Sequence, residues 1–481
     1  MPVRPLRILH AVHAFLPRHQ AGLEYYVHDL CRAQLAEGYH ATVVCAAYEP
    51  TRKHGEVTWR DYDAVPVVEI VNNWAGHQFD DTYRDPLITQ RLESVLESVK
   101  PDVLHVHSLL NLSFDLPQLA RRLGVRVVAT LHDYTLVCPV GGHRVHRAES
   151  FVCHAIDSTR CARCFAESPF SRLGTGAGGG TLASIARVAR SFVPLTRRSG
   201  VSTLPTPPDI DLRLDAARAV FDAVDLFVSP SASLAREFVA FGLPEAKLRV
   251  SDYGLKPRRY PPLPRTPRAR LRIGFVGTLV WHTGAHVLLD AARLLPANAF
   301  DLTIVGDLGT SPEYVADLRS RTAGIRVTFA GAVARADLER QYDRLDVLVV
   351  PYLGLEGSPR VIHEAFMADV PVVGSKLGGI PDLVQHDRNG LLFEAGNATD
   401  LAHELRRLLT DPDLLPQLSE ALAEIKSIDE DAREWEQIYE ALVEGPRAGS
   451  AAAGAATTAG AATTVGASTT APSERVDSPS E

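Results

Sequence analysis

Short apolar runs rich in β-branched residues alternate with helical patterns along most of this chain. Strands and helices that alternate in this way form parallel sheets with helices on both faces. Two such series are present, with strands predicted at residues 7–15, 41–47, 65–71, 102–108 and 126–133, and then at 272–278, 300–307, 326–331, 347–352, 371–376 and 390–393. The sequence therefore predicts an α/β protein with two doubly wound, Rossmann-like domains that face each other across a cleft.

Proline content and a break in the alternation mark the predicted boundaries. Five prolines lie between residues 257 and 267, a density typical of a linker. The alternation stops over residues 138–208, which we expect to be an insertion in the first domain. A final Ala, Thr, Gly and Ser tract has no aromatic residue and is expected to be disordered. The expected parts are an N-terminal domain at 1–256, a linker at 257–270, a C-terminal domain at 271–427, a last helix at 428–445 and the disordered tail at 446–481.

Charge and composition limit the class of protein. The 481 residues are 46% hydrophobic, which is enough for more than one core. Fifty Lys and Arg stand against 58 Asp and Glu, and this net charge of -8 argues against nucleic acid as the main partner. The N-terminal apolar run at residues 8–12 is too short for a signal peptide, and no stretch has the ~18 apolar residues of a membrane-spanning helix. We therefore expect a cytoplasmic protein.

The segment 351–366 carries the most specific chemistry. A predicted strand is followed by Gly357, by Ser358 as the expected N-cap, and by a proline at the first helical position. Free amides at such a helix start suit a diphosphate. Glu364 on the helix can accept hydrogen bonds from a ribose diol, and Glu356 on the loop from sugar hydroxyls, although two solvated carboxylates are the plainer alternative. A second turn at Gly378 and Gly379 is expected at the same sheet edge.

Together these features resemble the donor-binding region of retaining family 4 glycosyltransferases of the GT-B fold, whose two signature glutamates are separated by seven residues, like Glu356 and Glu364. Residues 15–24 look like the glycine loop of that family. Residues 101–107 and 130–133 look like its two histidine-bearing strand ends. The resemblance extends across most of residues 7–445.

The resemblance implies roles for individual residues. Glu364 would hold the ribose, Glu356 would contact the donor sugar, and His132 would sit over that sugar from the opposite domain, although a core histidine is the alternative for His132. Gly22 would let the backbone approach the diphosphate. The remaining expected donor-binding residues are Thr278, His282, Ser358, Arg360, Gly378 and Gly379.

The activity that the resemblance implies is transfer of a hexose from a UDP- or GDP-sugar to a glycan or lipid-linked glycan, with retention of configuration and without a catalytic metal. In this fold the last helix crosses back to the first domain, with Trp435 as the expected anchor.

One departure from the family pattern concerns the charge at the diphosphate. Thr278 and Thr283 stand where the family usually has an Arg and a Lys that clamp the diphosphate. This departure leaves a catalytically weak nucleotide-sugar-binding partner protein as one alternative. A nucleotide-sugar 2-epimerase, which shares the two-domain architecture, is the other.

The insertion contributes two further hypotheses. Four cysteines within 27 residues have spacings that suit a structural zinc site, with free thiols or a redox pair as alternatives: Cys138, Cys153, Cys161 and Cys164. Residues 158–200 hold seven arginines and one acid, and apolar residues recur there at helical spacing. This pattern is typical of a helix on an anionic membrane surface or of one packed on its own domain. We accordingly expect peripheral contact with the inner membrane surface and a lipid-linked acceptor in cell-surface or exported glycan assembly.

Overall fold

The computed structural model describes residues 4–74, 78–146, 151–167, 171, 201, 203–262 and 269–445. The tail at 446–481, the predicted amphipathic helix within 172–200 and part of the proline-rich linker lie outside these residues. Met1–Val443 form one compact unit that contains two parallel sheets. These two Rossmann-like halves confirm the fold class predicted from the alternation of strands and helices.

The first sheet, as described, contains eight strands: β1 (Arg7–Val12), β2 (His40–Ala47), β3 (Val57–Tyr62), β4 (Val65–Val71), β5 (Val103–Val106), β6 (Arg126–Thr130), β9 (Leu226–Ser229) and β10 (Leu248–Val250). Their spatial order is β10-β9-β6-β5-β1-β2-β4-β3, and among these described strands β3 alone is antiparallel to its neighbour. The chain leaves β1 toward β2 and returns to its other side at β5. Ligands of doubly wound sheets bind beside such a reversal, at the carboxyl ends of the strands.

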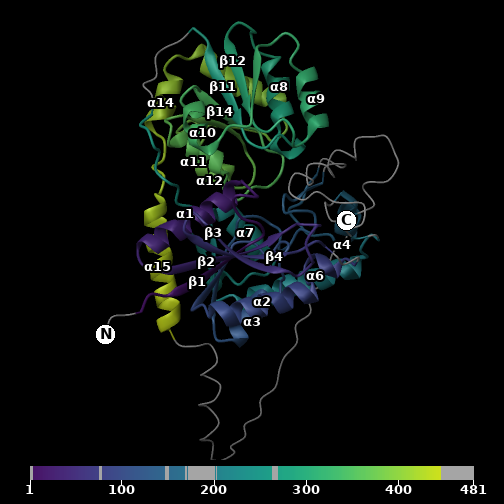
Figure 1. Ribbon diagram of the computed structural model, residues 1–481. Coiled ribbons are helices and arrows are strands. Elements are labelled where there is room, and N and C mark those ends of the chain that lie inside the picture. The colour runs from purple at the N-terminus through teal and green to yellow at the C-terminus, as the bar shows by residue number, and fades with distance from the viewer. Residues whose placement is uncertain are drawn as a thin grey trace, which may run out of the picture. The chain divides into compact units, whose positions relative to one another are not determined.

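Helices cover both faces of this sheet because side chains alternate along each strand. Leu9 and Ala11 of β1 pack in the core formed with α2 (Pro86–Val99), α3 (Leu116–Arg122) and α6 (Pro207–Ala223). Ile8 and Val12 pack in the opposite core with α1 (Gly22–Ala36) and α15 (Ile428–Glu444). Figure 1 shows α2 and α3 beneath the sheet and α15 running beside β1.

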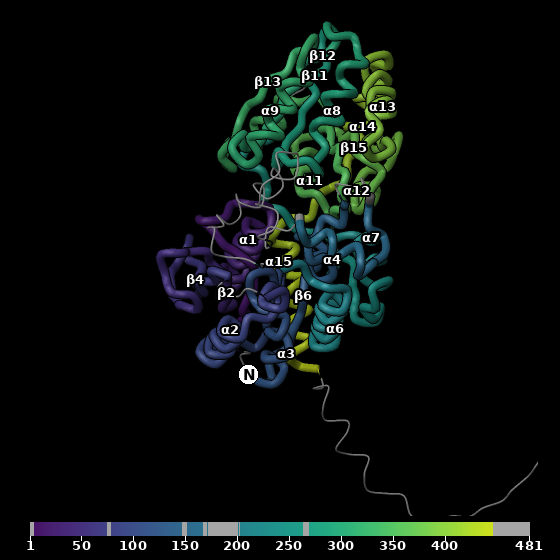
Figure 2. The backbone as a smooth tube through the Cα atoms, turned by 90° about the vertical axis from the view of Figure 1, so that its right-hand side faces the viewer, coloured from purple at the N-terminus to yellow at the C-terminus, as the bar shows by residue number. Residues whose placement is uncertain are grey.

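The second sheet, as described, contains six parallel strands: β11 (Leu271–Val276), β12 (Phe300–Val305), β13 (Val327–Gly331), β14 (Val347–Val350), β15 (Val372–Ser375) and β16 (Gly390–Phe393). Their order is β13-β12-β11-β14-β15-β16, so the strand order reverses between β11 and β14. The helices on one face are α8 (Ala285–Ala292), α9 (Pro312–Ser320), α13 (Ala398–Thr410) and α14 (Leu414–Glu420). Those on the other are α10 (Arg335–Tyr342), α11 (Arg360–Phe366) and α12 (Ile380–Leu383). Figure 2 shows α8 and α13 side by side over this sheet.

The insertion has some regular structure within its described part. A short antiparallel hairpin pairs β7 (Val145–His146) with β8 (Phe151–Val152), and α4 (Ser158–Cys164) follows. Within the described ranges, no helix combines the length and the apolar character that crossing a membrane requires.

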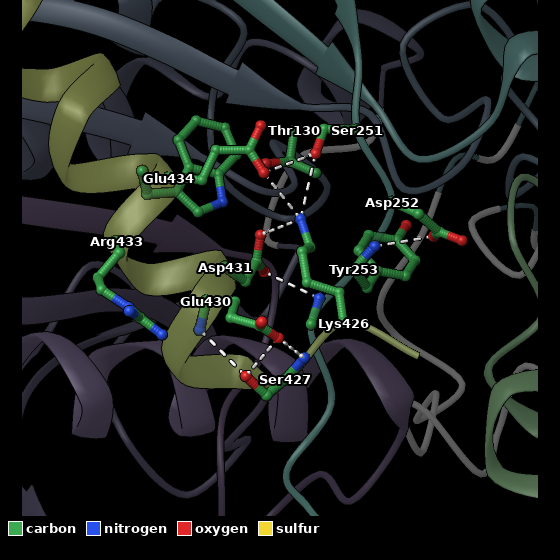
Figure 3. A network of polar contacts seen from close by, with 12 residues as sticks. Thr130, Ser251, Asp252, Tyr253, Lys426, Ser427, Glu430, Asp431, Arg433 and Glu434 are labelled. Carbon is green, nitrogen blue, oxygen red and sulfur yellow. Dashed lines mark hydrogen bonds and ion pairs between the residues drawn. The ribbon is translucent and has the colours of Figure 1, made fainter. Parts of the chain in front are cut away.

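Helix α15 is joined to the first sheet by polar as well as apolar contacts. The Tyr26 hydroxyl donates to Asp431 Oδ2 at 2.9 Å and accepts from the Trp435 indole N–H at 3.2 Å. Lys426, just before the helix, donates from Nζ to Asp431 Oδ1 at 2.8 Å and to Glu434 Oε2 at 3.0 Å (Figure 3). The bonds of Tyr26 hold α15 against α1, and those of Lys426 fix the segment that leads into α15.

Candidate functional site

A cleft of about 910 Å³ lies at the carboxyl ends of strands from both sheets. His13 follows β1 and Asp133 follows β6, whereas Thr278 follows β11 and Glu356 follows β14. All four side chains line the cleft, as does His282. Both points of strand reversal therefore contribute to one concave site.

The loops after β11 and β14 are held together by backbone contacts. Leu353 N donates to the carbonyl oxygen of His282 at 2.8 Å. Gly284 has a φ of +73°, and a Cβ there would lie 1.8 Å from the carbonyl oxygen of Pro351. Glycine is required at this position for both its conformation and its size.

The threonine at the position of the expected lysine has its hydroxyl bonded to its own loop. Thr283 is buried, and its hydroxyl donates to the carbonyl oxygens of Thr278 at 2.8 Å and Val280 at 2.7 Å. Thr278 itself is exposed in the cleft. The hydroxyl of Thr283 therefore stabilises the loop after β11 and is not directed at a diphosphate.

The glycine turn at Gly378 and Gly379 packs directly on the loop that carries Glu356. Gly379 N donates to the carbonyl oxygen of Glu356 at 2.8 Å. A Cβ at Gly378 would lie 2.7 Å from that same oxygen, and a Cβ at Gly379 would lie 1.7 Å from the carbonyl oxygen of Gly357. The two glycines allow this close approach and thereby fix the backbone on which Glu356 stands.

Ser358 does not cap the following helix, contrary to the prediction. The N-cap residue of α11 is Pro359, with no side-chain cap hydrogen bond. Ser358 Oγ instead donates to Asp252 Oδ1 at 2.9 Å, and His363 Nε2 lies 2.7 Å from Asp252 Oδ2. Because Asp252 supplies a charged acceptor, the hydroxyl donates to it and is not positioned to accept from the helix amides.

A second group of predicted donor-binding residues is not among the described residues that line the cleft. This group consists of Gly22, Arg360 and Glu364. Arg360 Nη1 donates to the carbonyl oxygen of Gly22 at 2.8 Å, and its Nη2 lies 3.9 Å from Glu364 Oε1. Glu364 Oε2 accepts from the Tyr342 hydroxyl at 2.9 Å. Burial, together with this carboxylate, raises the pKa of Tyr342 well above its usual value, so the hydroxyl remains a donor.

His132 belongs to a buried chain of hydrogen bonds. His10 Nε2 lies 2.9 Å from Gln34 Oε1, His10 Nδ1 lies 3.0 Å from His107 Nε2, and His107 Nδ1 lies 3.1 Å from His132 Nε2. Because Gln34 Oε1 accepts, each Nε2 along the chain donates to the next acceptor. The Tyr253 hydroxyl, 2.9 Å from His132 Nδ1, must then donate to it. Both ring nitrogens of His132 are therefore engaged within the protein.

His105 extends this network toward α15. Its Nδ1 lies 2.7 Å from the Tyr439 hydroxyl, and its Nε2 lies 2.7 Å from Thr130 Oγ1. Burial lowers the pKa of His10 to about 4 and that of His132 to about 3. These two imidazoles are accordingly neutral near pH 7, and His132 is the half-buried member of the network.

Two features of the cleft were not assigned from the sequence. His143 has its Nδ1 3.7 Å from Glu356 Oε1, and its ring stacks on that of His282 with centroids 3.9 Å apart. Glu24 is fully buried, and its Oε1 lies 3.0 Å from His19 Nδ1 and 3.4 Å from His13 Nε2. No local motif connects residue 143 with residue 356, so tertiary structure was needed to reveal that pair.

All four insertion cysteines line the cleft. Burial, followed by the effect of the nearby Cys138, raises the pKa of Cys161 to about 12. Among the described residues, no group of three possible metal ligands within 4.8 Å of one another includes a cysteine. The zinc site at these cysteines therefore stays a prediction.

Solved structures with the same architecture identify the class of fold. A structure of Anabaena Alr3699/HepE in complex with UDP and glucose aligns with a TM-score of 0.57 at 17% identity, covering 92% of this chain and 100% of that one. Sucrose-phosphate synthase from Thermosynechococcus elongatus aligns with a TM-score of 0.63 at 16% identity, covering 91% and 99%. The two facing Rossmann-like halves are thus those of the GT-B fold.

Two family models match the sequence, Glycosyltransferase Family 4 over residues 21–172 and Glycosyl transferases group 1 over residues 270–411. The chain belongs to this glycosyltransferase family. Amylovoran biosynthesis glycosyltransferase AmsK of Erwinia amylovora is 28% identical over 200 residues, which are 40% of this chain and 49% of that protein. The putative colanic acid biosynthesis glycosyltransferase WcaL of Escherichia coli K12 is 30% identical over 198 residues, 39% and 48% of the two chains. The chain spans about half the length of these curated relatives.

Proposed function

We propose that this chain transfers a hexose from a UDP- or GDP-sugar to a glycan or lipid-linked glycan, with retention of anomeric configuration. The observation that carries the proposal is the placement of Glu356 and Glu364 around the loop after β14. That loop is fixed by Gly378 and Gly379 at the strand reversal of the second sheet, where nucleotides bind in doubly wound folds.

The names of relatives and structural neighbours support both candidate donor nucleotides, UDP and GDP. They also support an acceptor that is a surface glycan or a lipid. The Anabaena structures contain UDP-glucose or UDP with glucose, and a relative from Mycobacterium tuberculosis is named as a GDP-mannose-dependent phosphatidylinositol monomannoside mannosyltransferase. AmsK is named for amylovoran biosynthesis, and WcaL is named as a putative enzyme of colanic acid biosynthesis. We infer that the reaction belongs to cell-surface or exported glycan assembly at the cytoplasmic face of a membrane.

The proposed chemistry uses the departing diphosphate. The bond between the anomeric carbon and the diphosphate oxygen breaks as the acceptor hydroxyl oxygen bonds to the same carbon from the same face. The hydroxyl proton passes to the departing phosphate oxygen. Glu364 holds the ribose, Glu356 orients the sugar, and Gly22 with Arg360 borders the diphosphate. Preorganised donors around the leaving group stabilise the charge that develops on it.

The role proposed for His132 carries a structural condition. Its two ring nitrogens bond to His107 and Tyr253, so a contact with the donor sugar requires exchange of one of these bonds. The bond to the Tyr253 hydroxyl lies at the end of the histidine chain, so its exchange leaves the bonds among the histidines intact. We propose that His132 exchanges this bond when the donor binds.

A second candidate is a nucleotide-sugar binder without turnover. The observation that favours it is the inward hydrogen bonding of Thr283, at the position where a phosphate-binding lysine is expected. Such a partner protein would bind UDP or GDP and consume no donor. A nucleotide-sugar 2-epimerase would instead convert the donor without any acceptor.

Substitution of the two glutamates tests the division of roles. We expect Glu364→Gln to weaken UDP or GDP binding by about tenfold, the loss of roughly one charge-assisted hydrogen bond. Glu356→Gln should retain nucleotide affinity within about twofold and lower turnover by about a hundredfold. Isothermal titration with UDP and GDP and a donor-consumption assay measure these effects. Glu394→Gln, at an exposed carboxylate paired with Lys376, is the matched control. Equal losses of nucleotide affinity in both variants would contradict the assignment.

A further inference from the structure

We propose that His143 is a positioning residue for Glu356, whose carboxylate it holds across the cleft in the orientation that the donor sugar requires. His143 lies in the insertion of the first half, whereas Glu356 lies on the loop after β14 in the second half. This role rests on the proposed function, in which Glu356 orients the sugar. It gives the insertion a part in turnover that is separate from nucleotide binding.

The side chains of the two residues meet in the cleft. His143 Nδ1 lies 3.7 Å from Glu356 Oε1, and the two side chains are 46% and 31% exposed. This distance is that of an ion pair and is longer than a hydrogen bond. The contact engages one carboxylate oxygen, so Oε2 can accept a hydrogen bond from a sugar hydroxyl. Ion pairs this exposed stabilise little by themselves, so other groups must fix the geometry of the contact.

The main chain of His143 fixes the loop that carries Glu356. Leu355 N donates to the carbonyl oxygen of His143 at 3.0 Å. A Cβ at Gly354 would lie 3.0 Å from the same oxygen and 3.3 Å from Val145 Cγ1, so the loop packs closely on the insertion. The residue next to Glu356 is thus bonded to His143 itself, and the backbone sets which two side chains meet.

The ring of His143 also packs against a second loop of the C-terminal half. It stacks on the His282 ring with centroids 3.9 Å apart and 28° between the planes. His282 follows β11, and its carbonyl oxygen accepts from Leu353 N at 2.8 Å. Packing of this kind restricts rotation of the His143 ring, so Nδ1 stays beside Glu356.

The residue after His143 anchors this part of the insertion in the first half. Arg144 is 4% exposed and donates from Nη1 to Glu237 Oε2 on α7 (Ala232–Ala240). Its guanidinium carbon lies 4.5 Å from the centre of the Phe241 ring. The φ of Arg144 is +48°, a conformation that is rare for residues with a side chain and that persists where the surrounding structure imposes it, often at functional sites. His143 is therefore presented to the cleft from a fixed backbone.

Charges in the cleft favour the protonated form of His143. Burial lowers the pKa of His143, but the contact with Glu356 and the charge of Asp133 outweigh this effect and raise the pKa above its ordinary value of 6.5. The His282 ring, which stacks on it, is a further titratable group at this contact. Below the pKa of His143 the contact with Glu356 is an ion pair, and it loses this charge as the pH rises through that pKa.

NMR titration of the full chain with isotope-labelled histidine tests the contact without any donor. The resonance that is absent from His143→Asn belongs to His143. Its pKa should lie above 6.5 in the wild type and should be lower in Glu356→Gln, because the carboxylate that raises it is lost. Glu394→Gln, at the exposed carboxylate paired with Lys376, should leave this pKa unchanged. Equal pKa values of His143 in the wild type and in Glu356→Gln would overturn the proposal.

Transfer kinetics test the positioning role. His143→Phe keeps an aromatic ring and the main-chain bond to Leu355 but removes the contact with Glu356, so kcat should fall by about tenfold while the affinity for UDP or GDP stays within about twofold. His143→Asn, whose amide nitrogen takes the place of Nδ1, should keep kcat within about threefold of the wild type. His403→Asn, at an exposed histidine, is the control and should behave like the wild type.

A double-mutant cycle separates action through Glu356 from a general loss of structure. His143→Phe should change kcat by less than about twofold in the Glu356→Gln background, because the group on which it acts is already altered. A further tenfold loss in that background, or a His143→Phe protein as active as the wild type, would overturn the positioning role. If the wild type consumes no donor, the proposed function and the role in turnover are both rejected, while the titration still decides whether His143 holds Glu356.

Discussion

Four histidines, His10, His105, His107 and His132, share one buried network whose hydrogen bonds have defined directions. Proton positions follow from Gln34, whose Nε2 donates to the Tyr439 hydroxyl at 3.3 Å and whose Oε1 therefore faces His10. Such a network has no place for an added proton, because each acceptor nitrogen already receives a hydrogen bond. Its stability must therefore depend on pH.

The N-terminal half should lose stability as the pH falls from 6.5 toward 4. Burial lowers the pKa of His10 from 6.5 to about 4, so the unfolded chain binds more protons in this interval and unfolding becomes easier on acidification. His10 alone should cost about 2 kcal/mol at pH 5 relative to pH 7.5. Urea unfolding at the two pH values measures the loss. His10→Gln should reduce this pH dependence and His403→Gln, at an exposed histidine, should not. An unchanged pH dependence in His10→Gln would contradict the account.

At the scale of single elements, close approach between turns positions the candidate site. The turn before α12 contacts the loop before α11 through Gly379, whose φ of -82° is accessible to any residue. A substitution there is therefore unfavourable through space alone, since a Cβ would lie 1.7 Å from the carbonyl oxygen of Gly357. Gly379 is therefore required for its small size alone, whereas Gly284 is required both for its small size and for its positive φ.

Gly379→Ala should displace the loop that carries Glu356 and lower turnover by about tenfold or more, since small misplacements of reacting groups are costly. We also expect a loss of about 1–3 kcal/mol in the free energy of unfolding. Donor consumption and thermal unfolding measure the two effects. Gly309→Ala is the control, because a Cβ there would meet its nearest atom at 3.4 Å. If Gly379→Ala behaved like Gly309→Ala, the turn would not position the site.

The elements also show which features could be predicted from the sequence. Local sequence features define helices α1 and α2, namely apolar spacing and, in α2, a proline at the first position. Strand β3 was missed, since its residues are half-buried or exposed at the sheet edge and give no apolar run. The pairs that form the site, such as Glu364 with Tyr342 or His143 with Glu356, depend on tertiary contacts between segments that no local pattern connects.

At the scale of the whole molecule, α15 lies against the first sheet although it follows the second sheet in sequence. Trp435 is 2% exposed, and its ring lies 4.2 Å from that of His105. Tyr439 is fully buried beside them, and its hydroxyl lies 2.7 Å from His105 Nδ1. The stability of the N-terminal half thus depends on residues near the end of the described chain.

Truncation before Ile428 should destabilise the N-terminal half as well as the C-terminal one, whereas truncation at Pro446 should leave activity intact. Trp435→Ala in the full chain should cost about 3–5 kcal/mol, as expected for removal of a buried aromatic side chain. Limited proteolysis followed by mass spectrometry locates the region that loses protection. Equal protection of the N-terminal half with and without residues 428–445 would show that α15 does not support it.

The most direct test of the proposed activity is mass spectrometry of a pool of UDP- and GDP-sugars incubated with the full chain, with and without candidate glycan and lipid-linked acceptors. The account predicts that one class of donor is consumed when an acceptor is present, that UDP or GDP is released, and that one hexose is added to the acceptor. Glu356→Gln should slow this change by about a hundredfold while the protein still binds the nucleotide. Conversion of the donor without an acceptor, or binding without consumption of any donor, would contradict the assignment as a transferase.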